Sequence, residues 1–297
     1  MMKNKVYNSD RRFDIINTSL LILIGLMFVY PIWFVVIASL SSPAEIWSGN
    51  VVFLPKGFNL NGYKAIMKQA EIWIGYKNSL FYLTAGVIIS LFLTTCAAYP
   101  LSRRDFKAAG FLMKIYTFTM FFSGGIVPLY LLVKSMHMMN TRWAVLLPSA
   151  LSVYNLIIMR TYFQTAIPHE LYEAASIDGC TNIKYVNSVV IPLSKPILAV
   201  IALYYGVARW NEFFNPLMFL TDRNKLPLTV FLREYLLQMQ MSTDMLGGDA
   251  RNAAEQLQMA EKLKYGIIIV SSIPMLIIYP FVQKYFVKGV MIGSIKG

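Results

Sequence analysis

The chain has 297 residues, of which 57% are hydrophobic and 14% charged, and its mean hydropathy is +0.53. A composition this apolar excludes an ordinary soluble domain and predicts a polytopic membrane protein. The formal net charge of +12 would suggest nucleic-acid binding in a soluble protein. Here the basic residues lie mostly beside apolar segments, where the positive-inside rule accounts for them, so no nucleic-acid partner is expected.

Six apolar stretches are each long enough to cross a bilayer as a helix, which takes about 20 residues. They are residues 13–40, 78–100, 111–133, 143–162, 197–220 and 265–286. The first is too long for the apolar region of a signal peptide, so we expect an uncleaved span. No internal repeat is visible, which counts against an inverted-repeat secondary transporter. The sequence predicts an all-α protein with six transmembrane helices in a single domain, residues 1–297.

Basic residues beside the short loops predict the orientation of the chain. Several lie in the connection 102–110, before the first span and after the last. Since short positive loops stay in the cytoplasm, we expect both termini, this connection and the polar segment 168–196 there. The segment 222–264 would then be an extracytoplasmic loop. Its Met-rich part, 239–249, is either a flexible partner-binding surface or a disordered connection.

The polar segment 168–196 predicts two short helices joined by a turn. Pro168 suits a first helical position, and acidic residues follow in the first turn, where the helix dipole favours them. Gly179 follows Asp178 where a left-handed residue would end the helix. A second helix would follow and stop at Pro192. Small apolar residues at helical spacing on the first helix predict a face that another protein can approach closely.

The residues of this segment also occur in a recognisable order. In sequence they are Glu173, Ala174, Ala175, Asp178, Gly179 and Pro192. This order resembles the EAA loop of bacterial ABC-importer permeases, the cytoplasmic coupling helix that sits in a groove of a separate ATPase. The resemblance implies a multi-pass protein of the bacterial cell membrane. Its partners would be a second homologous permease, ABC ATPase subunits and an extracytoplasmic solute-binding protein. A loop helix of some other membrane protein is the alternative.

No enzyme site emerges from the sequence. The chain lacks a Gly-rich phosphate-binding loop ending in Lys-Ser or Lys-Thr, so we do not expect it to hydrolyse ATP in the P-loop manner. Its histidines, His137 and His169, have no carboxylates nearby at metal-ligand spacing. We therefore expect no catalytic residue, no metal site and no cofactor on this chain, with ATP and Mg²⁺ held by the partner ATPase.

The fifth apolar stretch carries a cluster of polar and aromatic residues. Its members are Tyr205, Arg209, Asn211, Glu212 and Asn215. Charges inside a span are costly and face a cavity or a partner helix, and aromatic rings beside amide and charged groups suit sugars. Residues 210–213 also resemble a stretch that recurs in carbohydrate permeases of the maltose type. The cluster either lines a carbohydrate path or, through an Arg209–Glu212 pair, locks helices together.

The C-terminal tail, residues 287–297, resembles the glycine-rich ending of the maltose-type second permease subunit. In that family the tail can reach the ATPase interface, and glycines allow such close approach. The candidate contact residues are Gly293, Ser294, Lys296 and Gly297, and a frayed terminus is the alternative. Residues 122–125 are similar to the branch that handles complex oligosaccharides. The competing function is a self-contained secondary transporter or channel. A membrane-embedded assembly factor has no feature in its favour.

Overall fold

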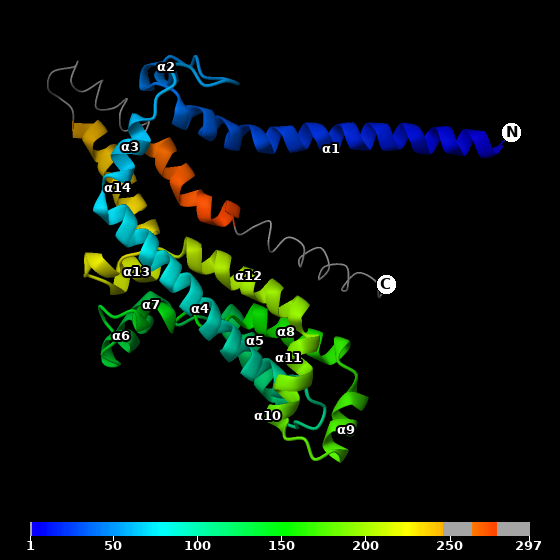
Figure 1. The fold of residues 1–297 in the computed structure, drawn as a ribbon. Helices are drawn as coiled ribbons and strands as arrows, with labels where there is room; N and C mark the ends of the chain where they lie inside the picture. The colour runs from blue at the N-terminus through cyan, green and yellow to red at the C-terminus, as the bar shows by residue number, and fades with distance from the viewer. Residues whose placement is uncertain (1, 246–262, 278–297) are drawn as a thin grey trace. The chain divides into compact units, whose positions relative to one another are not determined.

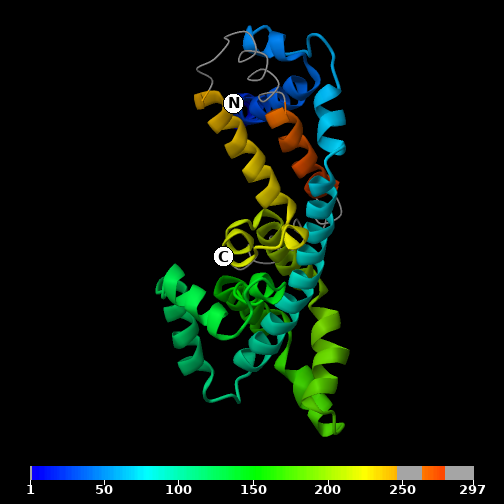
Figure 2. The same ribbon diagram turned by 90° about the vertical axis from the view of Figure 1, so that its left-hand side faces the viewer.

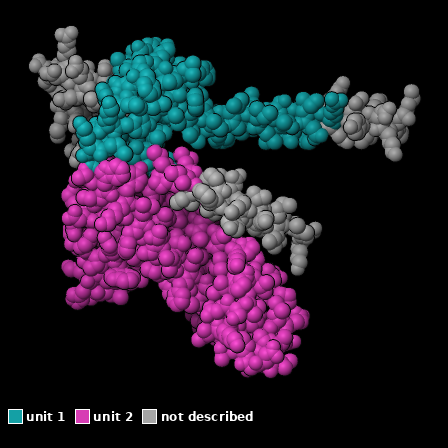
Figure 3. All heavy atoms as spheres, in the orientation of Figure 1, with its two compact units in different colours: residues 1–69, 235–272 teal, residues 70–234, 273–297 magenta. Residues whose placement is uncertain are grey.

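The computed structural model describes residues 2–245 and 263–277, and the regular structure in these ranges is helical. The predicted all-α class is therefore confirmed over the described residues. The chain divides into two compact units (Figure 3): residues 1–69 with 235–272, and residues 70–234 with 273–297. The tail 287–297, with Gly293, Ser294, Lys296 and Gly297, lies outside the described residues.

Unit 1 contains the first predicted span. In α1, Met2–Leu40, the apolar stretch Phe13–Leu40 is long enough to cross a membrane, and its side chains are exposed as far as Trp33. A helix that presents apolar side chains on all faces suits a lipid environment. The unit also holds α2 (Pro43–Trp47), α3 (Asn61–Met67), the last part of α14 (Leu228–Met245) and the first part of the helix Leu263–Ile277.

Unit 2 is organised around α4, Ala70–Ser102, which also is long and apolar enough to cross a membrane. α4 runs the length of the unit (Figures 1 and 2) and packs against α8 (Val153–Ala166) and α12 (Lys195–Asn211). Fully buried apolar side chains fill the core of these helices, among them Ala98, Leu156, Met159 and Ile201. The other helices are α5 (Ala109–Phe121), α6 (Ile126–Ser135), α7 (Trp143–Leu146), α9 (His169–Ile177), α10 (Asn182–Tyr185), the π-helix Val186–Val190, α11 (Ile191–Leu193), α13 (Phe214–Phe219), the 3₁₀ turn Arg223–Lys225 and the start of α14.

Three of the predicted spans are broken, which corrects the expectation of continuous helices. The stretch 111–133 forms α5 and α6, which meet at 114°. The chain leaves the helical conformation at Phe122, which is extended with ψ 111°, and Gly125 precedes α6 with φ +85°. The stretch 143–162 is interrupted between α7 and α8, and Ser152 caps α8 by accepting from the Asn155 N–H at 3.4 Å. Among the described residues, two helices can cross a membrane, or four if each bent pair forms one span.

The fifth predicted span, 197–220, ends its first helix at Asn211 and resumes in α13. Glu212 is extended, with ψ 120°, and its carbonyl cannot receive a helical bond from Pro216, which has no N–H. The Thr229 hydroxyl donates to that carbonyl instead, at 2.8 Å. Of the sixth predicted span, residues 265–277 are helical, and the remainder lies outside the described residues.

The predicted outward segment 222–264 is not an irregular loop over its described part, because α14 occupies Leu228–Met245. Leu228 and Phe231 are buried at helical spacing, and the Leu228 N–H donates to Ser79 Oγ at 2.9 Å. Packing against α4 therefore holds the first turns of α14. The prediction of a flexible Met-rich loop is wrong for residues 239–245, and residues 246–262 lie outside the described residues.

Candidate functional site

The first helix of segment 168–196 ends in a Schellman turn. Gly179 has φ +71°, and its N–H donates to the Ser176 carbonyl at 3.1 Å, while the Cys180 N–H reaches the Ala175 carbonyl at 2.9 Å. These are the two bonds that close a helix before a left-handed residue. The left-handed backbone predicted at Gly179 is confirmed.

Two prolines of the segment, Pro168 and Pro192, act differently from the prediction. Pro168 precedes α9 as its N-cap, with ψ 140°, and the helix starts at His169. The second helical run continues through Pro192 to Leu193, so the prediction that Pro192 ends it is wrong. Pro192 lies in the first turn of α11, directly after the π-helical turn Val186–Val190. A proline is tolerated in a first turn, so its missing N–H does not end the helical run. The run ends instead at Ser194, before an 82° bend into α12.

The outer face of α9 is apolar and unusually exposed. None of its nine residues is buried, and Glu173, Ala174 and Asp178 are exposed. Beside them, Ile177 is 86% exposed and Ile183, in α10, is 77% exposed. Among the described residues, these two are the most exposed of the large hydrophobic side chains.

The polar cluster at the C-terminal end of α12 is centred on Arg209, whose side chain is 2% exposed. Its Nη1 donates to the Val145 carbonyl and Ser149 Oγ at 2.9 Å each and to Glu212 Oε2 at 3.0 Å, and its Nη2 donates to the Leu146 carbonyl at 2.8 Å. The guanidinium thus caps the carbonyl end of α7 and pairs with the carboxylate beyond α12. Both terminal nitrogens of Arg209 therefore bind acceptors of the same chain.

Gly86 in α4 makes room for this arrangement. A Cβ at position 86 would lie 2.8 Å from Arg209 Nε and 3.1 Å from its Cδ, a separation that real Cβ atoms do not show. The absence of a side chain at this position therefore lets the Arg209 stem cross α4 on its way to α7. No feature of the sequence alone links Gly86 to Arg209.

The other four residues of the predicted sugar path differ in exposure. Tyr205 is 3% exposed; its hydroxyl lies 2.7 Å from Thr94 Oγ1 and accepts the Ser152 N–H at 3.0 Å. Asn211 is exposed, and its Nδ2 donates to the Val207 carbonyl of its own helix at 2.9 Å. Glu212 and Asn215 are half-buried and hydrogen-bonded to each other. The structure thus groups Arg209, Glu212 and Asn215, separates Tyr205 into the core, and leaves Asn211 open.

No family model matches the chain, but individual relatives do. The polygalacturonan/rhamnogalacturonan transport system permease protein YtcP of Bacillus subtilis is 36% identical over 97% of this chain and 99% of its own length. Protein LplC of the same organism is 36% identical over 97% of this chain and 96% of its own length. A solved bacterial ABC transporter that imports the acidic polysaccharide alginate matches with a TM-score of 0.83 and 33% identity, over 94% of this chain and 98% of that chain.

The chain belongs to the permeases of carbohydrate ABC transporters. The family resemblance stated from segment 168–196 is therefore confirmed, and a secondary transporter or channel is not favoured. Permeases of this family are membrane transporters and not catalysts. Among the residues that the structure describes, no group of three or more His, Cys, Asp or Glu side chains could hold a metal ion.

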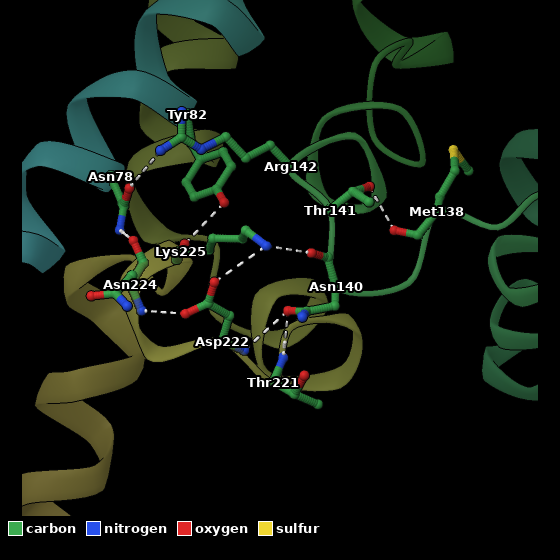
Figure 4. Close-up of polar contacts among 10 residues, drawn as sticks. All are labelled: Asn78, Tyr82, Met138, Asn140, Thr141, Arg142, Thr221, Asp222, Asn224 and Lys225. Atoms are coloured by element: carbon green, nitrogen blue, oxygen red, sulfur yellow. Dashed lines mark hydrogen bonds and ion pairs between the residues drawn. The ribbon is translucent and has the colours of Figure 1, made fainter.

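A second polar network of the permease, shown in Figure 4, was not predicted. At its centre Asn140 adopts φ +56°, and its Oδ1 accepts the N–H groups of Thr221 and Asp222 at 3.2 and 3.0 Å. Lys225 Nζ donates to the Asn140 carbonyl at 2.9 Å and pairs with Asp222 at 3.2 Å. The Asn224 N–H and the Lys225 ammonium hold the pKa of the Asp222 carboxyl below its usual value.

This network fastens two loops to α4. Asn78 Nδ2 donates to the carbonyls of Asn224 and Leu226 at 2.7 and 3.1 Å, and the Tyr82 hydroxyl donates to the Lys225 carbonyl at 2.9 Å. Arg142 Nη2 reaches Asn78 Oδ1 at 3.4 Å. The only sequence signal was the tolerance of asparagine for left-handed backbone, which does not identify its partners.

Proposed function

We propose that this permease forms one half of the translocation path of an ATP-driven importer, with a second homologous permease forming the other half. Segment 168–196 would face the cytoplasm, as would both termini, and α9 would dock into an ABC ATPase subunit. A solute-binding protein would deliver substrate from the outside. The tail residues Gly293, Ser294, Lys296 and Gly297 would add contacts to the ATPase.

The observation that supports the docking proposal is the exposure of α9. Its nine residues include none that is buried, its small Ala174 is exposed, and the left-handed Gly179 ends it sharply. A helix that stays folded while exposing aliphatic side chains needs a partner to cover them. Glu173 and Asp178 are also exposed and would lie at the rim of this contact, where charges set orientation more than affinity.

A charged substitution in the docking face tests this proposal. Ala174→Asp would place a carboxylate in a closely packed contact, and burying an unpaired charge is strongly unfavourable. We expect the ATPase to be lost when the assembled transporter is purified through the permease. The same change at Ala108, which is exposed but outside the segment, is the matched control. Undiminished recovery of the ATPase with Ala174→Asp would refute the docking role.

For the substrate, we propose oligosaccharides that contain uronic acids. Polygalacturonan and alginate, named for two of the most similar proteins, are both acidic polysaccharides. Relatives with names that refer to arabinooligosaccharides and to melibiose, raffinose and stachyose are only 27% and 26% identical.

The proposed path runs beside the break between α12 and α13. Asn211, which is exposed, would face it, Glu212 and Asn215 would border it, and Tyr205 and Arg209 would hold the wall from behind. The substrate class is tested by the ATPase activity of the reconstituted transporter in the presence of its binding protein. Trigalacturonate should stimulate hydrolysis and a neutral trisaccharide should not. The reverse preference would contradict the proposed substrate.

A further inference from the structure

Arg103, in the connection between α4 and α5, lies beside the coupling helix α9. Its guanidinium carbon is 3.1 Å from the centre of the Tyr172 ring and 6.0 Å from that of Tyr99. Its Nε and Nη2 each donate to the Asp105 carboxylate at 2.9 Å. These bonds hold the pKa of the Asp105 carboxyl below its usual value. Only 13% of the Arg103 side chain is exposed, so its orientation is fixed.

Two tyrosine rings face this guanidinium, Tyr172 and Tyr99, and a third tyrosine, Tyr185, packs against both rings. Tyr172 comes from α9, Tyr185 from the end of α10 and Tyr99 from the last turns of α4. The rings of Tyr172 and Tyr185 meet edge to face at 5.4 Å, and those of Tyr99 and Tyr185 lie 6.3 Å apart. Arg103 and the three rings therefore form one continuous contact from α9 to α4, which we call the tyrosine cage.

Few other contacts attach α9 to the rest of unit 2. Of its hydrophobic residues, Tyr172 and Ala175 pack against the hydrophobic core, and the half-buried His169 ring meets the Tyr172 ring edge to face at 6.0 Å. Ala175 contributes a single methyl group, whereas Tyr172 presents a whole ring face to a planar cation. A displacement of α9 therefore reaches α4 mainly through Tyr172 and Arg103.

We propose that Arg103 is a positioning residue that transmits the movement of α9 to α4 when ATP is hydrolysed. This inference rests on the proposed docking of the ATPase at α9. A planar guanidinium fits the role, because it can stack on Tyr172 and at the same time bind Asp105 with two parallel bonds. A lysine can supply the charge but not both contacts.

The test is the number of sugar molecules transported per ATP hydrolysed by the complete transporter in proteoliposomes. Arg103→Gln should lower this ratio by about tenfold, which is the order expected for one desolvated cation–π contact. Arg103→Lys should restore part of it. Arg104→Gln is the matched control, because it removes the same charge from the adjacent exposed arginine. Tyr172→Phe keeps the ring and should retain the ratio, whereas Tyr172→Leu should lower it as Arg103→Gln does.

Recovery of the ATPase on purification separates this inference from the docking proposal. Arg103→Gln should leave recovery unchanged while uncoupling transport from hydrolysis. An unchanged transport ratio in Arg103→Gln, or an equal loss in Arg104→Gln, would overturn the positioning role. Loss of the ATPase or of the folded permease in Arg103→Gln would overturn it as well, because Arg103 would then support assembly. If Ala174→Asp retains the ATPase, the docking proposal itself fails.

Discussion

Arg209 offers the sharpest test of how the interior of the permease is held. Arg209→Ala removes four hydrogen bonds at once and leaves Glu212, whose side chain is 14% exposed, without its cation. Removing one partner of a buried ion pair costs about 3–5 kcal/mol. The carbonyls of Val145 and Leu146 also lose a donor, at about 1 kcal/mol or more each, although these costs are not additive. We expect a loss of about 4 kcal/mol.

The assay is the apparent unfolding temperature of the purified permease complex in detergent. A loss of this size lowers it by on the order of 10 °C, and Glu212→Gln in the Arg209→Ala background should restore part of the difference by removing the unpaired charge. The reasoning is refuted if Arg209→Ala assembles and unfolds like the parent but fails to transport. Arg209 would then act on the substrate and not as a clamp between helices.

Three further substitutions probe individual positions. Gly179→Val should weaken the end of α9 by about 2 kcal/mol, because a β-branched residue resists φ +71°, and should uncouple transport from hydrolysis, whereas Gly179→Asn should not. Gly86→Ala should lower the unfolding temperature, because overpacking against Arg209 reduces the free energy of unfolding by about 1–3 kcal/mol. Gly206→Ala is the control and should be tolerated, because the atom nearest to its added Cβ is 3.6 Å away. Asn140→Ala should cost about 1–2 kcal/mol, because two N–H groups lose their acceptor and alanine is strained at φ +56°, and Asn140→Gly should cost less, because glycine adopts this φ freely. Each is read from unfolding temperatures, and a change within 1–2 °C (about 0.5 kcal/mol) contradicts the corresponding contact.

The sequence correctly predicts those features of the fold that depend on neighbouring residues. The first span matches Phe13–Leu40, and α4 contains the predicted second span, because long apolar runs have no other stable state in a bilayer. Gly179 follows the same logic, since a glycine after the last helical turn has the backbone freedom to end it. These features depend on residues that are neighbours in the chain.

The sequence does not predict those features of the fold that depend on residues far apart in the chain. The stretch 111–133 is mostly apolar, yet its helix is interrupted at residues 122–125, and an average of hydropathy over the stretch does not reveal this interruption. The sequence predicts a loop where α14 begins, because the stability of this helix comes from packing against α4. One of the two alternatives predicted for Arg209 was a pair with Glu212, and the structure contains this pair. The capping of α7 and the crossing at Gly86 depend on residues more than 60 positions away.

Reconstitution of the permease with and without its proposed partners tests the central claim most directly. Proteoliposomes would contain either the permease alone or the permease with a second permease and ATPase subunits, with loaded binding protein outside and ATP inside. We predict accumulation of an acidic oligosaccharide only in the complete assembly and only with hydrolysable ATP. Accumulation by the permease alone, under an ion gradient and without ATP, would contradict the account.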